Sequence, residues 1–303
     1  MCYSAQVYAE VRKFERVLGR PVDVDWYVKT FWSADKKGKR KKIPRVFERQ
    51  ALELAPPDIQ AAVREADQVE IDQLTQTISK QRARVVAAER ALQKRETKKA
   101  REDIRIGNDM LQRAQRRLDE LKSDPGNRGR VFPGHYAPVV VLEDGRYVLR
   151  AMRYRCRLPG WTEEVERKYP GTYNARRDKL ETAWRQVFGR NHGVMLASSF
   201  FEHVDRDGQD QVLEFKPSDG QDMIVACLWT KVTDEDGAQI YTFAAVTDEP
   251  PAEVAEAGHD RCIIPIKPEH VVAWLSPQDR SKDDLQAILE DRQRPYYEHR
   301  IAA

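Results

Sequence analysis

The sequence has few cysteines, and their spacing does not indicate a metal site. The four are Cys2, Cys156, Cys227 and Cys262, and no two of them form a CxxC pair. Structural zinc sites usually have closely spaced cysteine and histidine ligands, and disulfide frameworks need more cysteines in a shorter chain. We therefore expect no metal, no cofactor and no disulfide framework, with Cys2 as a free thiol in a reducing cytoplasm.

Long hydrophobic runs are also missing. No apolar stretch approaches the roughly 20 residues that a bilayer-spanning helix needs. The N-terminus does not have the basic region and apolar segment of a secretory leader. We therefore expect a cytoplasmic protein with no membrane partner.

A large net charge is absent, although charged residues are abundant. The 303 residues are 33% charged and 41% hydrophobic, and the formal net charge is +3. Any affinity for nucleic acid must therefore come from local patches. The run from Lys36 to Arg45 has seven cationic residues in ten, among them Lys39 and Arg40. Such a run is either a solvated loop or a DNA contact.

Proline is absent from residues 58–122, which contain a single glycine, Gly107. Two sets of apolar residues recur there with a seven-residue period and are out of phase with each other. They are Ile71, Leu74, Ile78, Val85, Ala88 and Leu92, then Ile104, Leu111, Ala114, Leu118 and Leu121. The pattern favours two helices of about 22 residues, folded into a coiled-coil hairpin within an insertion at residues 56–126. A single long helix with a stutter is the alternative.

The remaining sequence predicts an α+β fold with a mixed or antiparallel β-sheet core and flanking helices, interrupted by this helical coiled-coil insertion. The core would comprise residues 1–55 and 127–275, followed by a C-terminal helix and tail at 276–303. The stretch "HYAPVVVLEDGRYVLRAMRY" predicts a hairpin that turns at Asp144 and Gly145. Further strands are predicted in "GVMLASSFFEHV", "DMIVACLWTKV" and "IYTFAAVT", and helices in "KLETAWRQVFG" and "PPAEVAEAG".

Cys2 is the first residue with chemical interest. Removal of Met1 would give it a free α-amine next to its thiol, with ordinary pKa values of about 7.7–8.0 and 8.5. The amine can condense with an aldehyde, and the thiol can then close a five-membered thiazolidine ring. A cysteine at position two can also be a matter of chance.

Three further segments carry candidate functional residues. In "TYNARRDKLET", Asn174 and Arg176 could hold a polar substrate and a phosphate. In "VMLASSFFEHV", Glu202 ends an apolar strand, where burial favours general acid–base chemistry. In "AGHDRCIIPI", His259 has the side chain whose ordinary pKa lies nearest neutrality. Each has a plainer alternative: a polar loop, a glutamate facing water, and a structural histidine.

In order and spacing, these segments resemble the SOS response-associated peptidase (SRAP) family, whose members crosslink to abasic sites in single-stranded DNA. The family opens with Met-Cys-Gly-Arg and continues with Asn-Ala-Arg, Gly-Phe-Tyr-Glu-Trp, Gly-Leu-Trp and His-Asp-Arg-Met-Pro. The matching segments are "MCYS", "NAR" at 174–176, "SFFEH" at 199–203, "ACLW" at 226–229, "HDRCIIP" at 259–265 and "AWL" at 273–275. The resemblance covers residues 1–55 and about 130–275.

The resemblance implies a role for each candidate. Cys2 would attack the ring-opened sugar aldehyde, and Asn174 would position the amine and the sugar. Glu202 and His259 would transfer protons, and Arg176 would hold a phosphate. The family is also described as a peptidase that removes its own methionine.

The sequence departs from the family pattern at several positions. Tyr3 and Ser4 replace the Gly-Arg after the cysteine, and "RCRLPGW" replaces the segment Trp-Gly-Leu-Val-Pro-x-Trp. Of that segment, the proline and Trp161 remain, and Arg155 and Arg157 could replace the lost aromatic contact by binding phosphates. Asp178 is the nearest equivalent of a Glu-Thr that commonly follows the Asn-Ala-Arg motif.

The leading hypothesis is a DNA-repair enzyme that forms a covalent link through Cys2 at abasic sites in single-stranded DNA. One alternative is an N-terminal-nucleophile cysteine amidohydrolase, which would attack an amide. The other is a non-catalytic interaction protein whose coiled coil binds a partner and whose remaining domain is a degenerate SRAP-like module. The insertion itself could be a dimer seam, a docking arm, a clamp over DNA or a hairpin packed on itself.

Overall fold

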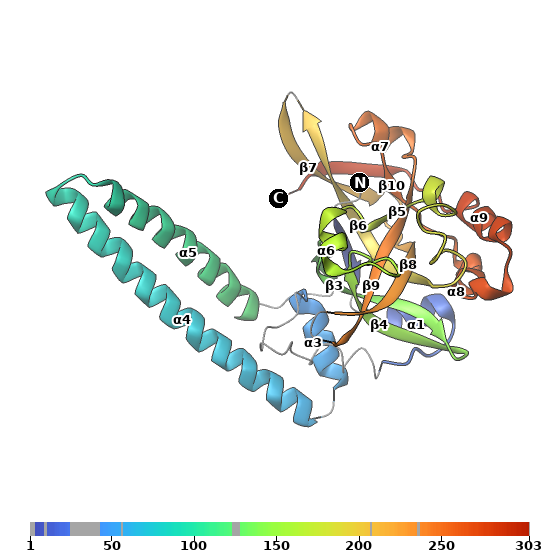
Figure 1. The fold of residues 1–303 in the computed structure, drawn as a ribbon, viewed down its shortest axis with the longest axis horizontal. Coiled ribbons are helices and arrows are strands. Elements are labelled where there is room, and N and C mark those ends of the chain that lie inside the picture. The colour runs from blue at the N-terminus through green and yellow to red at the C-terminus, as the bar shows by residue number, and fades with distance from the viewer. Residues whose placement is uncertain are drawn as a thin grey trace. The chain divides into compact units, whose positions relative to one another are not determined.

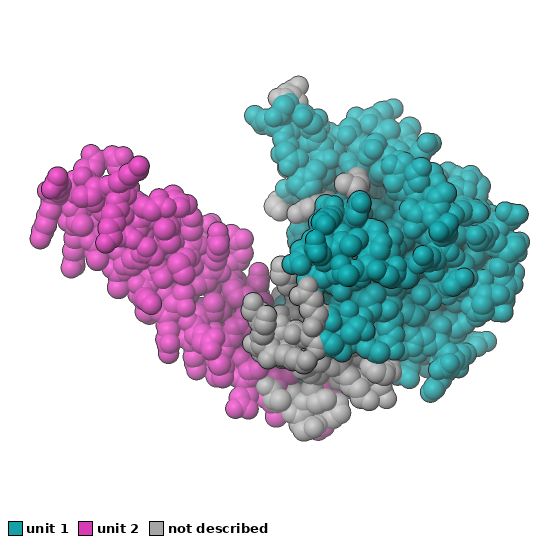
Figure 2. Space-filling model, viewed as in Figure 1, with its two compact units in different colours: residues 1–54, 127–303 teal, residues 55–126 magenta. Residues whose placement is uncertain are grey.

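The computed structural model describes residues 4–8, 11–24, 43–55, 57–122, 128–206, 208–234 and 237–302. The chain divides into two compact units, one containing residues 1–54 and 127–303 and the other residues 55–126 (Figure 2). Within the described residues, no helix combines the length and the apolar character needed to cross a membrane.

The smaller unit is a hairpin of two helices, α4 (Pro57–Lys94) and α5 (Lys98–Lys122). Its apolar contact joins Ile71, Leu74 and Ile78 of α4 to Leu111, Ala114 and Leu118 of α5. The helices pack tightly at Gly107, where an added Cβ would lie 2.5 Å from Val85 Cγ2. Two ion pairs also join the helices, one between Arg84 and Asp103 and one between Glu70 and Arg117. The helical hairpin is therefore confirmed, and the single long helix is wrong.

The larger unit contains the strands and the remaining helices, which confirms the α+β class (Figure 1). The strands are β1 (Ser4–Tyr8), β2 (Arg128–Val131), β3 (Tyr136–Glu143), β4 (Arg146–Tyr154), β5 (Asn174–Arg176), β6 (His192–Arg206), β7 (Gln209–Pro217), β8 (Met223–Thr233), β9 (Gln239–Asp248), β10 (Cys262–Ile263) and β11 (Tyr297–Ile301). The helices are α1 (Val11–Leu18), α3 (Arg45–Leu54), α6 (Glu163–Lys168), α7 (Ala252–Glu256), α8 (Val271–Leu275) and α9 (Lys282–Glu290), with 3₁₀ turns at Arg177–Lys179, Pro268–His270 and Pro277–Asp279.

Five strands pair in a closed ring. β3 pairs with β4, β4 with β9, β9 with β8, β8 with β6, and β6 again with β3. All these pairs are antiparallel except β4–β9. The β3–β4 hairpin turns at Asp144 and Gly145, whose φ values of 48° and 72° suit the tight two-residue turn predicted there.

β6 continues beyond the ring into a second group of strands. Its later residues pair with β1 on one side and β7 on the other, and β2 and β11 extend these neighbours. The order of this outer group is β2–β1–β6–β7–β11. β6 therefore links the closed ring to the outer strands, and its side chains belong to both.

Helices cover the ring and contribute to one continuous core. α1 contributes Val11, Phe14 and Leu18, and α9 contributes Leu285 and Leu289. α8 contributes Trp274, which is completely buried and donates its Nε1 hydrogen to the Gly193 oxygen at 3.0 Å. This hydrogen bond attaches α8 to the second residue of β6.

Two expectations about secondary structure are wrong. The segment 179–189, expected to be helical, ends a 3₁₀ turn at Lys179 and continues as consecutive turns to residue 190. Within it Trp184 N bonds to Lys179 O, five residues back, instead of following the α-helical spacing of four. The segment after α9, expected to be a tail, forms β11 along β7 (Figure 1). In both places tertiary contacts outweigh local preference: Trp184, Val187 and Phe188 are buried in the core, and Tyr297 is 3% exposed.

A buried histidine lies at the start of β6. His192 Nε2 accepts a hydrogen bond from Gly189 N at 2.9 Å, and Nδ1 donates to Trp274 O at 3.1 Å. Both bonds suit a neutral ring, and burial lowers the pKa of His192 to about 3. Protonation would place a second hydrogen between Nε2 and the amide of Gly189.

This burial predicts a pH-dependent stability. An unfolded histidine takes up a proton near pH 6.5, whereas folded His192 stays neutral to about pH 3. The unfolded state therefore binds more protons in this window, and the free energy of unfolding should fall by about 1.4 kcal/mol per pH unit as the pH drops below 6. Urea unfolding between pH 6.5 and 5 measures the slope, which His192→Gln should remove and His270→Gln, at a partly exposed site, should retain. An unchanged slope in His192→Gln would show that other groups cause it.

Candidate functional site

Glu202 lies in β6, where the strand has joined the outer group. Its cross-strand neighbour on β7 is Leu213, and its side chain is 0% exposed. Alternation along the strand places it on the same face as Phe200, which stacks on Phe215 at 5.1 Å. Glu202 therefore points into an aromatic part of the core, and the alternative of a glutamate facing water is wrong.

His259 meets this carboxylate from the loop after α7. Its Nε2 lies 3.1 Å from Glu202 Oε2, and its side chain is 9% exposed. Gly258 precedes it with φ of +102°, which only glycine adopts easily. The structure thus brings together two residues that are 57 positions apart in the sequence.

The contact between His259 and Glu202 requires a shared proton. His259 Nδ1 lies 2.9 Å from the Arg261 oxygen and 3.2 Å from the Arg261 nitrogen, and burial lowers the pKa of the imidazole. If Nδ1 carries the hydrogen, Glu202 must be protonated to donate to Nε2. If Nε2 carries it, the ring donates to the Glu202 carboxylate. In either form one proton lies between the two side chains, ready to be transferred.

Asn174 contributes a buried amide at a neighbouring position in the sheet. It begins β5, which pairs with residues 245–247 of β9, and β10 pairs with residues 247–248 of the same strand. The side chain is 6% exposed, and neither its Oδ1 nor its Nδ2 has a hydrogen-bond partner among the described residues. A buried amide without partners is unfavourable by itself. This one is suited to bind a ligand.

Arg176 lies on the same face of β5 as Asn174, at its solvent end. Its side chain is 45% exposed and makes two hydrogen bonds with Asp178, at 3.0 and 2.9 Å. These hydrogen bonds lower the pKa of Asp178. The guanidinium is therefore accessible and held in a defined direction.

Arg155 and Arg157 occupy positions that differ from the expected phosphate contacts. The Arg157 side chain is 3% exposed, and its Nε donates to Glu166 Oε2 at 2.6 Å. Arg155 Nη2 donates to the Glu166 backbone oxygen at 2.7 Å, and Arg153 Nη2 donates to Oε1 at 2.5 Å. Three arginines therefore converge on Glu166, which is 2% exposed. We correct the expectation for Arg157: its burial makes it a support for the segment that leads to Asn174.

Trp161 is partly buried in that segment and has an aromatic neighbour that the sequence did not indicate. Its ring lies 5.2 Å from the ring of Tyr169, which is 57% exposed. Tyr169 stands five residues before Asn174. The pair forms an aromatic surface close in sequence to β5.

The remaining expected residues are Cys2, Lys39 and Arg40, which lie outside the described residues. The first described residue is Ser4, which is buried and opposite Phe201 in the β1–β6 pair. The other cysteines are buried, and burial raises the pKa of each thiol, to about 11 for Cys156. Among the residues that the structure describes, no group of His, Cys, Asp and Glu could hold a metal ion.

Comparisons with known proteins agree with the sequence resemblance. A family model described as SOS response associated peptidase (SRAP) matches residues 90–302, a range that includes Asn174, Glu202 and His259. The abasic site processing protein YoaM of Bacillus subtilis (strain 168) is 27% identical over 135 residues, covering 44% of this chain and 59% of YoaM. YoqW of the same organism, with the same description, is 26% identical over 136 residues, covering 44% and 60%. The chain thus spans about three fifths of the length of these relatives.

Solved structures show weaker similarity. A crystal structure of a protein from Bordetella bronchiseptica is 17% identical, with a TM-score of 0.49, and the match covers 58% of this chain and 87% of that one.

The arginine cluster on Glu166 generates a stability prediction. Glu166→Leu would leave Arg157 buried without its main carboxylate, which typically costs about 3–5 kcal/mol. We expect a loss of this size in the free energy of unfolding. Glu164→Leu is the matched control, because Glu164 is 72% exposed and its ion pair with Lys168 contributes little. Equal stability of the two variants, measured by urea unfolding, would contradict the structural role of Glu166.

Proposed function

The chain belongs to the SOS response associated peptidase (SRAP) family, and we propose that it processes abasic sites in single-stranded DNA by covalent capture through Cys2. Removal of Met1, which the family's description as a peptidase suggests, would expose the nucleophile. The proposal places the protein in the reducing cytoplasm, where the thiol of Cys2 stays free. Its main support is the buried contact between Glu202 and His259.

Chain connectivity supports the approach of Cys2 to this contact. Ser4 pairs with Phe201, and Glu202 is the next residue along β6. Two peptide units separate Cys2 from Ser4, so their Cα atoms are at most about 7.6 Å apart. This short connection supports the proposal that the N-terminal aminothiol reaches the Glu202–His259 pair.

The proposed reaction has two bond-forming steps. The Cys2 amine adds to the C1 aldehyde of the ring-opened sugar and loses water to form an imine. The thiolate then attacks the imine carbon, the nitrogen takes up a proton, and a thiazolidine ring closes. The first step needs a proton delivered to the departing hydroxyl, and ring opening of the sugar needs a proton removed from its C1 hydroxyl. A carboxyl–imidazole pair with one transferable proton suits both tasks.

Other residues would position the DNA. Asn174 is suited to bind the sugar or the α-amine, because its buried amide has unused donors and an acceptor. Arg176 would bind a phosphate, and Trp161 with Tyr169 would contact a base. Lys39 and Arg40 would add electrostatic attraction. Arg155 and Arg157 would act indirectly, by holding the segment before Asn174 through Glu166.

The covalent step predicts a specific loss on mutation of the nucleophile. Mixing the protein with an oligonucleotide that contains one abasic site should give an adduct stable to denaturing electrophoresis. Cys2→Ala should abolish it, because no thiol remains to close the ring. Cys2→Ser should leave at most a labile imine, which borohydride would trap. An adduct of normal yield in Cys2→Ala would refute the mechanism, and glutamine hydrolysis by the wild type would favour an amidohydrolase.

The proton-transfer pair predicts a kinetic loss without a loss of DNA affinity. Glu202→Gln keeps the size of the side chain but removes the transferable proton, so the rate of adduct formation at saturating DNA should fall on the order of 100-fold. Binding of undamaged single-stranded DNA should change little. Glu256→Gln, on the exposed face of α7, is the matched control and should react normally. A wild-type rate in Glu202→Gln would remove Glu202 from the mechanism.

A further inference from the structure

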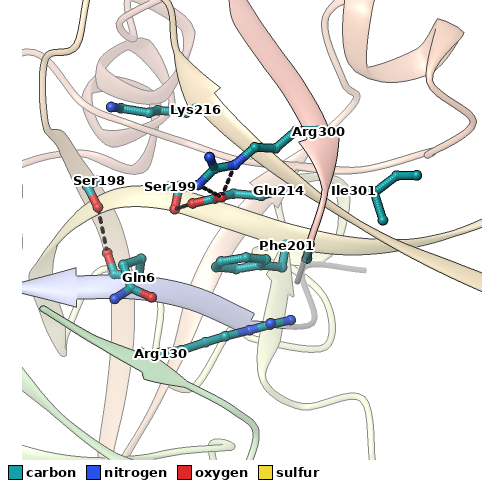
Figure 3. A pocket seen from close by; sticks show the side chains of 10 residues that line it. Gln6, Arg130, Ser198, Ser199, Phe201, Glu214, Lys216, Arg300 and Ile301 are labelled. Carbon is teal, nitrogen blue, oxygen red and sulfur yellow. Dashed lines mark hydrogen bonds and ion pairs between the residues drawn. The ribbon is translucent and has the colours of Figure 1, made fainter. Parts of the chain in front are cut away.

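A polar cleft lies on the outer strands. It has a volume of about 530 Å³ and is lined by β1, β2, β6, β7 and β11 (Figure 3). The side chains used below are those of Ser199, Phe201, Arg130, Glu214, Lys216 and Arg300. They come from four strands, β2, β6, β7 and β11.

Strand register explains why these side chains face the same cleft. Gln6 of β1 is opposite Ser199 of β6 and Arg130 of β2. Phe201 of β6 is opposite Glu214 of β7, and Arg300 of β11 is opposite the same Glu214. Paired residues project from the same face of a sheet. Phe201, which lines the cleft, is opposite Ser4 and projects from the other face of β6 than its neighbour Glu202.

The cleft is positively charged. Among the described residues, three cationic side chains and one carboxylate line it. Glu214 is already bound within the cleft, because Arg300 Nε donates to Oε2 at 2.8 Å and Ser199 donates to Oε1 at 2.7 Å. In Figure 3, Lys216 is drawn above this group and Arg130 below it. The net charge suits an anionic ligand.

Arg130 is held in place before any ligand binds. Its Nε donates to Ser4 Oγ at 3.0 Å, and its guanidinium lies 3.7 Å from the ring centre of Phe201 and 4.8 Å from that of Phe132. Contacts with ring faces restrain a guanidinium. A restrained arginine loses less entropy when it binds a phosphate.

We propose that this cleft binds the phosphodiester backbone of the DNA strand next to the lesion, with Arg130 and Lys216 as the phosphate contacts. The inference rests on the proposed function for its choice of ligand. An open cleft lined by five strands fits an extended polyanion. A free phosphate ion would occupy a small part of it.

Salt-dependent binding of undamaged DNA tests the cleft without the covalent step. The probe is a single-stranded oligonucleotide of about 15 nucleotides. Its binding is measured by fluorescence anisotropy at several salt concentrations. Arg130→Gln and Lys216→Gln should each weaken binding about fivefold. Each should also lower the slope of log K against log salt by about 0.7, the value for one lost phosphate contact. Arg146→Gln and Lys282→Gln, at exposed positions outside the cleft, should match the wild type.

Several outcomes would overturn the cleft assignment. Unchanged affinity and salt slope in the double variant Arg130→Gln, Lys216→Gln would do so, as would the absence of wild-type binding. Displacement of the oligonucleotide by inorganic phosphate at matched ionic strength would show a site for the free ion. Lys216 is exposed, so Lys216→Gln tests the proposal even if Arg130→Gln folds poorly.

Adduct formation separates this inference from the proposed function. At saturating abasic DNA the cleft variants should crosslink at the wild-type rate, with a higher DNA concentration needed for half of the maximum. Normal crosslinking with unchanged DNA affinity would refute the cleft alone. Weakened DNA binding in the variants, together with no crosslinking by the wild type, would support the cleft and refute capture by Cys2.

Discussion

The hydrogen bonding of β6 to four other strands is the constraint on which the larger unit depends. Its first half pairs with β3 and β8 and closes the ring, and its second half pairs with β1 and β7. One strand therefore determines where the ring ends, where the N-terminal strand lies, and which side chains face the core. Glu202 on one face and Phe201 on the other are adjacent residues with separate tasks because successive side chains point in opposite directions.

Two buried carboxylates illustrate how this framework tolerates charge. Glu166 is surrounded by three arginines, and Glu202 contacts one histidine whose pKa is lowered by burial. The first arrangement compensates a fixed negative charge and stabilises a segment. The second places a carboxyl group and an imidazole 3.1 Å apart, so that one proton lies between them. A buried carboxylate is thus structural in one place and suited to chemistry in the other, and the identity of its partner makes the difference.

Much of the secondary structure was predictable from local sequence. The seven-residue repeats predicted the helical hairpin, and Asp144-Gly145 between apolar runs predicted the β3–β4 turn. The segment at 179–189 was mispredicted because its apolar residues recur as in a helix, although core contacts fix Trp184, Val187 and Phe188 in consecutive turns. The β11 strand was missed because "YYEHRIAA" has no alternation strong enough to distinguish a strand from a tail, and its pairing partner β7 is some 80 residues away.

For the candidate site, too, some features were predictable from the sequence and others were not. The sequence by itself determined which residues have reactive side chains, because Asn174, Glu202 and His259 stand in segments with recognisable local patterns. Only the tertiary structure decided what each side chain contacts: that His259 meets Glu202, that Arg157 is buried against Glu166, and that Arg130 lies at Ser4. Charge and hydrogen-bonding capacity belong to the residue type, whereas burial and partners arise from strand pairings between distant segments. Those pairings depend on the whole set of strands, and a short stretch of sequence does not contain them.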